Sequence, residues 1–137
     1  MKLCSACLMG MRCRYDGKAK INPKVLELAE NDILIPVCPE QLGGLPTPRE
    51  PVEGGAKKLF AKNGNPPIKE FSDGAKEVLK IAKSLKIKEA ILKQRSPSCG
   101  CGQIYDGTFT GKVINGNGVT ADLLIRNGIK VISEEDL

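Results

Sequence analysis

The chain has 137 residues, a length typical of one domain with a single hydrophobic core. Hydrophobic residues make up 41% of it and Trp is absent, so we expect residues 1–137 to form one domain with an aliphatic core. Histidine is also absent, which excludes Ser-His and Cys-His nucleophilic systems and every metal site with a histidine ligand.

The 21 basic and 16 acidic residues give a net charge of +5, which is weak evidence for anionic partners and typical of ordinary solubility. Basic residues crowd in the predicted loops, which favours a nucleotide-like substrate. These residues are Arg12, Arg14, Arg49, Lys57, Lys58, Lys93 and Arg95.

No segment has the length or composition of a membrane span or a secretory signal. The longest apolar runs, such as residues 33–37, are far shorter than the roughly 20 residues that cross a bilayer. Residues 1–4 lack the apolar stretch of a secretory signal. We therefore expect a cytoplasmic protein without a membrane partner, and in a reducing compartment the six cysteines favour metal binding or catalysis over disulfides.

The first half of the chain alternates between strand and helix patterns. A short strand is expected over residues 3–6, followed by a loop over 7–20. Asn22 and Pro23 predict the start of a helix, because Asn is a common N-cap and Pro suits the first helical position. The apolar run 33–37 predicts a second strand, covered on both faces. The apolar face of the helix is expected to hold Val25, Leu26 and Ala29.

Two long segments without periodicity follow, and a predicted helix and strand lie between them. Residues 39–67 are rich in Gly and Pro, which predicts a long loop of the kind that is usually functional. Apolar residues then recur at helical spacing from 71 to 85, with Ser72 expected as the cap. A third strand is expected over 90–92, followed by a loop over 93–117.

The end of the chain predicts one more helix and one more strand. The helix is expected to begin at Thr120, to bury Leu123 and Leu124 and to stop at Gly128, before a strand over 129–132. Strands and helices alternate along the whole chain, which indicates a parallel sheet. We therefore predict an α/β fold: a single-domain, three-layer, Rossmann-like parallel sheet with helices on both faces and long active-site loops.

Three cysteines, Cys7, Cys38 and Cys99, are expected just beyond the carboxyl ends of three different strands. In an open α/β sheet these strand ends line the crevice where ligands bind. The three thiols are therefore expected to meet at one point. Three thiolates can hold a metal centre and leave one coordination position open, which indicates a catalytic rather than a structural site.

The spacing of the cysteines favours an iron–sulfur cluster over structural zinc. Structural zinc sites normally use two close C-x-x-C pairs, and this chain has one, formed by Cys4 and Cys7. Cys38 precedes a proline, as cysteines at cluster sites often do. A [4Fe–4S] cluster with three protein ligands leaves one iron free to act as a Lewis acid or to bind sulfur. A zinc site of Cys4, Cys7, Cys99 and Cys101 stays open as an alternative.

The other thiols, Cys4, Cys13 and Cys101, are expected to be small buried apolar residues, although Cys13 and Cys101 are also candidates for a place near the site. Two polar residues lie close to the ligand candidates in the sequence: Glu40 is two residues after Cys38, and Ser96 is three residues before Cys99. A carboxylate there can take a proton from water, and a hydroxyl can steer or relay one. Taken singly, each also fits a solvated loop carboxylate or a turn-capping serine.

Several long motifs resemble the thiouracil desulfidase (TudS) family. They read C-L-M-G-x-x-C-R-Y-D-G, P-V-C-P-E-Q-L-G-G-L-P-T-P-R-x-P-x-E and L-K-x-x-S-P-S-C-G. The resemblance continues through I-Y-D-G-T-F-T-G and G-x-G-V-T-A-x-L-L to the end of the chain. Cys4, Cys13 and Cys101 are extra thiols relative to the three-cysteine pattern of the family.

The resemblance implies an enzyme that removes sulfur from thiolated pyrimidines, such as 2-thiouracil, 4-thiouracil or thionucleosides, by non-redox hydrolysis. It implies a [4Fe–4S] cluster held by Cys7, Cys38 and Cys99, whose open iron binds the substrate sulfur before sulfide leaves. The catalytic carboxylate and hydroxyl of the family map to Glu40 and Ser96. The implied partners are a thiolated base or nucleoside and the sulfide product, and macromolecular nucleic acid is not expected.

Two readings from other functional classes stay open. The first is a non-catalytic module that binds a metal through cysteines or carries sulfur. The second is a thiol redox protein that uses the C-x-x-C motif of Cys4 and Cys7.

Overall fold

A computed structural model describes all 137 residues. Its centre is a sheet of four strands, β1 (Lys2–Ser5), β2 (Leu34–Val37), β5 (Glu89–Leu92) and β8 (Lys130–Ser133). The strands lie in the order β2-β1-β5-β8, and every neighbouring pair is parallel. Each strand lies within one residue of an expected apolar run, so the predicted parallel sheet is confirmed.

The order of the strands changes direction between β1 and β5. The chain moves from β1 outward to β2, and then returns to the other side of β1 to form β5 and β8. In doubly wound sheets such a switch point opens a crevice at the carboxyl ends of the two strands. The topology therefore places a ligand site where β1 and β5 end.

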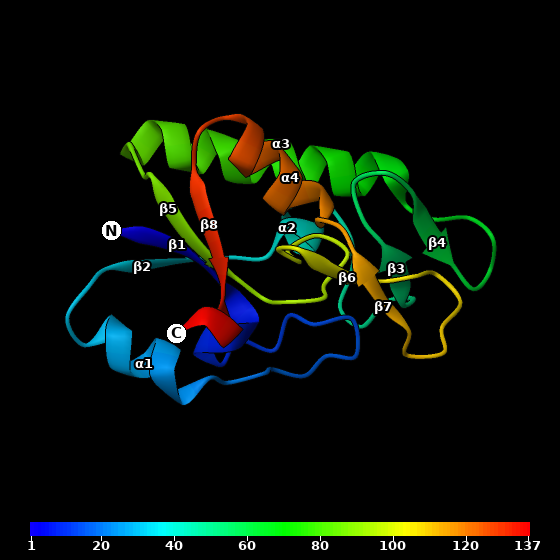
Figure 1. The fold of residues 1–137 in the computed structure, drawn as a ribbon, viewed down its shortest axis with the longest axis horizontal. Coiled ribbons are helices and arrows are strands. Elements are labelled where there is room, and N and C mark those ends of the chain that lie inside the picture. Colours follow the sequence, from blue (N-terminus) through cyan, green and yellow to red (C-terminus); the bar gives the residue numbers. More distant parts are fainter.

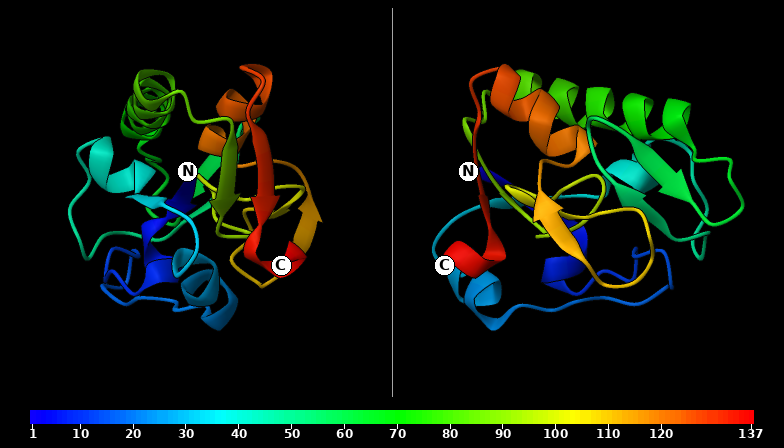
Figure 2. Two further views of the ribbon diagram at one scale, coloured as in Figure 1. Left: turned by 90° about the vertical axis from the view of Figure 1, so that its left-hand side faces the viewer. Right: turned by 45° about the vertical axis from the view of Figure 1, so that its right-hand side comes forward.

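Helices cover both faces of the sheet, as Figure 1 and the left view of Figure 2 show. The long helix α3 (Ile68–Leu85) and the shorter α4 (Val119–Arg126) lie against each other on one face. The other face carries α1 (Pro23–Ala29) and the 3₁₀ turn η1 (Ala6–Met9). The expected three-layer α/β architecture is confirmed.

Successive residues of the central strands enter different cores, because side chains alternate across a sheet. Leu3 and Leu92 pack in the cluster that contains Val78 of α3. Cys4 and Ile91 pack in the cluster on the opposite face. Cys4 is fully buried there, so its thiol belongs to a core.

The start of α1 follows its local signals. The Asn22 side chain accepts the backbone N–H groups of Lys24 at 3.0 Å and Val25 at 3.2 Å, and Pro23 occupies the first helical position. Val25 is fully buried, but the expectation for Leu26 is wrong, because Leu26 is 41% exposed. A helix of seven residues rests only a narrow stripe on the sheet.

The expected face of α3 is largely confirmed, whereas its expected cap is wrong. The helix begins at Ile68, four residues before Ser72, and it follows Pro67, which occupies the N-cap position. Leu85 at the other end is exposed. The buried stripe recurs at helical spacing through Phe71, Ala75, Val78 and Ala82.

The final helix and its stop signal agree with the sequence within one residue. Helix α4 begins at Val119 instead of Thr120, and Gly128 follows it with a φ of 80°. Leu124 is fully buried and Leu123 is half-buried. No helix of the chain combines the length and the apolar character needed to cross a bilayer.

The two long segments expected as loops, residues 39–67 and 93–117, contain regular structure. Each holds a hairpin of two short antiparallel strands, and both hairpins lie beyond the carboxyl ends of the sheet strands (Figure 1). Strands of three residues are too short to show alternation in a sequence. These elements are α2 (Pro39–Leu42), β3 (Val52–Gly54), β4 (Leu59–Ala61), β6 (Gln103–Tyr105) and β7 (Val113–Asn115).

Candidate active site

A cavity of about 450 Å³ lies at the carboxyl ends of the strands. Its walls come from η1 after β1, from α2 after β2 and from the loop after β5, so residues distant in the chain meet there. All five residues singled out in the sequence line it. They are Cys7, Cys38, Glu40, Ser96 and Cys99.

A fourth thiol, that of Cys13, lies beside two of the candidate ligands. Cys13 is buried, lines the same cavity and interacts through its thiol with those of Cys7 and Cys38. The Cys38 thiol donates a hydrogen bond to the Cys13 carbonyl at 3.6 Å. Contact with Cys13, together with burial, raises the pKa of Cys38 well above that of a free thiol. Cys13 is therefore part of the site. The sequence had left both Cys13 and Cys101 as candidates for a place near it.

Cys99 is held at the end of a serine turn. The Ser96 hydroxyl oxygen accepts the backbone N–H groups of Ser98 at 3.2 Å and Cys99 at 3.1 Å, which fixes the hydroxyl beside the thiol. Burial raises the pKa of Cys99 to about 12, against an opposing contribution from the Ser5 hydroxyl.

The Glu40 carboxylate is held at both oxygens. Arg49 Nε donates to Oε1 at 3.0 Å, and the Ser98 hydroxyl donates to Oε2 at 3.1 Å. An ionised carboxylate has about four lone-pair positions, so roughly two remain for a water or a substrate N–H. In the sequence Arg49 stood out only as a nearby cation, because the path of the loop between it and Glu40 was not predicted. No role was predicted for Ser98, because its contact with Glu40 joins segments 58 residues apart.

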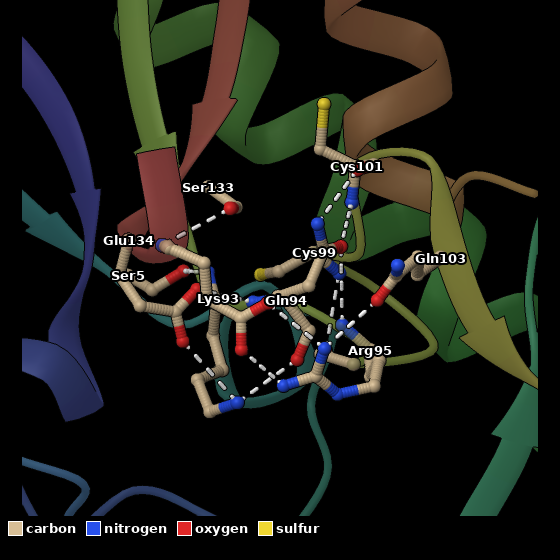
Figure 3. A network of polar contacts seen from close by, with 11 residues as sticks. Ser5, Lys93, Gln94, Arg95, Cys99, Cys101, Gln103, Ser133 and Glu134 are labelled. Atoms are coloured by element: carbon tan, nitrogen blue, oxygen red, sulfur yellow. Dashed lines mark hydrogen bonds and ion pairs between the residues drawn. The ribbon is translucent and has the colours of Figure 1, made fainter. Parts of the chain in front are cut away.

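A polar network connects the ends of β1, β5 and β8 (Figure 3), and Ser5, Lys93 and Gln94 of this network also line the cavity. Lys93 Nζ lies 3.3 Å from a Glu134 carboxylate oxygen, and the Gln94 backbone N–H donates to the other at 2.7 Å. The Lys93 backbone N–H donates to the Ser5 hydroxyl at 2.9 Å. The buried Glu134 charge is thereby paired, which a buried carboxylate requires.

Two cysteines lie outside the cavity lining. Cys101 donates its S–H to the Val131 carbonyl at 3.4 Å, and its sulfur points away from that of Cys99 (Figure 3). Cys4 donates to the Ser5 carbonyl at 3.6 Å inside a core. No three Cys, Asp or Glu side chains are arranged to hold a single metal ion. The alternative zinc quartet, which needed Cys4 and Cys101, is therefore not formed.

The donor set of the cavity fits an iron–sulfur cluster. Thiolates are the usual ligands of such clusters, and three free cysteines from three strand ends line one cavity. A cluster binds each thiolate at a different iron, so its ligands need not converge on one point as the ligands of a single zinc ion do.

These features define a class of protein, a doubly wound α/β fold with a thiol-lined cavity at its switch point. The family model of the 2-thiouracil desulfurases matches residues 3–136, so the chain belongs to this family. Membership confirms the resemblance seen in the motifs and the expected class of enzyme, one that cleaves carbon–sulfur bonds.

Two similar proteins carry the comparison further. The uncharacterized protein YbbK of Bacillus subtilis (strain 168) is 42% identical over 147 residues, which cover 100% of this chain and 97% of YbbK. A solved structure of the [4Fe-4S]-dependent thiouracil desulfidase TudS is 40% identical, with a TM-score of 0.92. That match covers 99% of this chain and 91% of the TudS chain, so the likeness extends over the whole fold.

Proposed function

We propose that this chain is a [4Fe–4S]-dependent desulfidase that removes sulfur from thiolated pyrimidines such as 2-thiouracil, 4-thiouracil or thionucleosides. The observation that carries the proposal is the meeting of three cysteines, a carboxylate and a hydroxyl in one cavity. The likeness to TudS supports it. We also propose that residues 1–137 act as one desulfidase domain, because the cavity lining extends from Ser5 to Gly111.

Cys7, Cys38 and Cys99 are the residues that would hold the cluster. When bound through three thiolates, the cluster supplies a Lewis-acidic iron with an open position and an affinity for sulfur. The three cysteines belong to different elements, so the site exists only in the folded chain.

Glu40 is the proposed general base. Its carboxylate keeps lone pairs free while Arg49 and Ser98 hold both oxygens, so it can take a proton from a water bound in the cavity. That water attacks the ring carbon that bears the sulfur. The water oxygen replaces the sulfur as C=S and H₂O give C=O and H₂S, and no electron is gained or lost.

Ser96 is the proposed proton relay. Its oxygen accepts two backbone N–H groups, so its own O–H remains free to donate to another group in the cavity. It can return to the departing sulfur the proton that Glu40 removes from water.

The shape and walls of the cavity support a small planar substrate. Its volume of about 450 Å³ lies within the range of small-molecule sites. Tyr15, Tyr105 and Phe109 line it and offer ring faces on which a base can stack. A free base or nucleoside therefore suits it better than a nucleic-acid polymer.

The test is anaerobic reconstitution followed by a sulfide assay. We expect about four irons per chain and sulfide release from 2-thiouracil or 4-thiouridine, with none from uracil. A fully loaded protein that releases no sulfide from any thiolated base would contradict the proposal. Retained sulfide binding without turnover would instead favour the non-catalytic sulfur-carrying module.

A further inference from the structure

We propose that Arg49 is a positioning residue, which sets the Glu40 carboxylate for proton transfer, with Ser98 as its second anchor. The inference rests on the proposed role of Glu40 as general base. Arg49 lies between α2 and β3, and its side chain is only 6% exposed although it is charged. Such burial of a guanidinium requires that its donors be satisfied.

The Arg49 guanidinium uses all three of its nitrogens on acceptors of the protein. Besides its bond to Glu40, Nη1 donates to the Pro46 carbonyl at 3.2 Å and to Thr47 Oγ1 at 2.8 Å. Nη2 donates to the Cys13 carbonyl at 2.8 Å. A planar fork bound at four acceptors is fixed in one orientation, and it fixes its acceptors in turn.

These bonds join the two segments that carry the candidate chemistry. The Cys13 carbonyl, held by Arg49, also accepts the Cys38 thiol at 3.6 Å. Cys38 is the N-cap of α2, and Glu40 lies in the first turn of the same helix. The buried Arg49 side chain therefore fixes the Glu40 carboxylate relative to the backbone of Cys13, beside the thiols of Cys13 and Cys38.

Ser98 completes the arrangement from the opposite side. It is 1% exposed, and its carbonyl accepts the backbone N–H groups of Thr120 at 2.8 Å and Ala121 at 3.1 Å. The start of α4 thus holds Ser98 while Ser98 holds Glu40 Oε2. With both oxygens bound, the carboxylate cannot rotate without breaking a charge-assisted hydrogen bond.

A lysine at position 49 separates a geometric role of Arg49 from a role of its positive charge. Lysine keeps the positive charge, but its single nitrogen cannot reproduce a fork to four acceptors. Arg49→Lys should therefore lower kcat on the order of 10²-fold, because a misplacement near 1 Å has an effect of that size, and should leave KM within about twofold. The control is Arg126→Lys, which changes an exposed ion pair on α4 and should leave both constants unchanged.

Iron content and the visible absorption of the anaerobically loaded variants are measured alongside kcat and KM. A wild-type kcat in Arg49→Lys would overturn the proposal, and so would a raised KM with unchanged kcat, which would indicate direct substrate binding. If Arg49→Lys fails to load iron, Ser98→Ala replaces it. This variant frees one carboxylate oxygen and should lower kcat about tenfold with KM unchanged, since ordering of a catalytic group depends on each anchor.

A double-mutant cycle separates this inference from the proposed function. In a Glu40→Gln background, Arg49→Lys should have no further effect, because the two residues act as a unit. Full additivity would overturn the role of Arg49 and leave that of Glu40 intact. A wild-type kcat in Glu40→Gln alone would overturn the base itself, and the inference with it.

A crystal structure of Arg49→Lys gives a readout that needs no turnover. We expect the Glu40 carboxylate to leave its position beside Ser98 or to occupy more than one conformer. An unchanged, singly occupied carboxylate would overturn the proposal.

Discussion

The six thiols of this chain differ by environment, because the same residue type lies in a cavity wall, in a core or against a carbonyl. Cys7, Cys38 and Cys99 face the cavity, whereas Cys101 donates to a strand carbonyl and Cys4 lies in a core. Spacing in the sequence separated the first three from the others. The inclusion of Cys13 required the fold, because its partners come from two other segments.

Replacing single cysteines should divide them in the same way. Cys7→Ser, Cys38→Ser and Cys99→Ser should each lower iron from about four per chain towards zero, because each removes one of three thiolate ligands. Cys101→Ser and Cys4→Ser are the controls and should keep iron near the wild-type level. Iron and acid-labile sulfide are measured after anaerobic reconstitution. Equal damage from Cys4→Ser and Cys7→Ser would favour the thiol redox reading.

The two proposed proton-transfer residues should affect rate without affecting loading. Glu40→Gln and Ser96→Ala should each lower kcat by about 10²–10⁴-fold, the usual contribution of acid–base groups, while iron content stays unchanged. Glu50→Gln is a matched control, because this carboxylate is exposed and lies outside the cavity lining. Sulfide release at saturating substrate measures the effect, and wild-type rates in both variants would remove acid–base catalysis from the proposal.

At the scale of elements, the place of Glu40 depends on how closely α2 approaches α3. A Cβ added to Gly74 of α3 would lie 1.9 Å from the Pro39 carbonyl, and one added to Gly43 would lie 1.9 Å from the Glu70 carbonyl. Only residues without a side chain allow this contact. The glycines therefore set the distance between α3 and the short helix that carries Glu40.

Gly74→Ala should destabilise the protein although alanine favours a helix. The propensity gain of about 1 kcal/mol is outweighed by a clash with backbone, and we expect a net loss of about 1–3 kcal/mol in the free energy of unfolding. Lys76→Ala, at an exposed position of the same helix, should change stability little. Urea denaturation compares the variants, and a Gly74→Ala protein as stable as the wild type would show that α2 can shift freely.

Which elements the sequence could predict depends on how local their causes are. The cap of α1 is built from Asn22 and its next neighbours, so it was visible in the sequence. The hairpins β3–β4 and β6–β7 are held by distant contacts, such as the Glu53 carboxylate, which accepts the N–H groups of Gly107 at 3.1 Å and Phe109 at 3.0 Å. No short window of sequence contains those contacts.

At the scale of the whole molecule, one half-buried charge cluster secures the start of the chain. The Met1 amino group lies 3.0 Å from one oxygen of Asp32, and Lys2 pairs with the other. These cations, Lys2 first, hold the pKa of Asp32 well below its ordinary value of 3.8. The pairs join the beginning of β1 to the turn before β2, its neighbour in the sheet.

The ion pairs of Asp32 should make the free energy of unfolding depend on pH. Because its pKa is lower in the folded chain than in the unfolded one, its contribution is present above the unfolded value of 3.8 and is lost as pH falls towards the folded value. Asp32→Asn should therefore unfold at a lower urea concentration than the wild type at neutral pH. The difference should shrink as the pH falls below 3.8, the ordinary pKa of this side chain. Glu30→Gln, which removes an exposed carboxylate without an ion pair, should show no such trend. A pH-independent difference for Asp32→Asn would contradict the assignment.

The sequence by itself determined the parallel α/β sheet, the family and five of the residues that line the cavity. These follow from apolar runs, from strand-to-ligand spacing and from contiguous motifs, all of which are read along the chain. Only the tertiary structure decided that Cys13 lies at the site, that Cys4 and Cys101 do not line the cavity, and that Arg49 and Ser98 hold Glu40. The reason is physical: most of these contacts join segments that are far apart in the chain, and even the Arg49–Glu40 pair, nine residues apart, depends on the folded path of the loop between them.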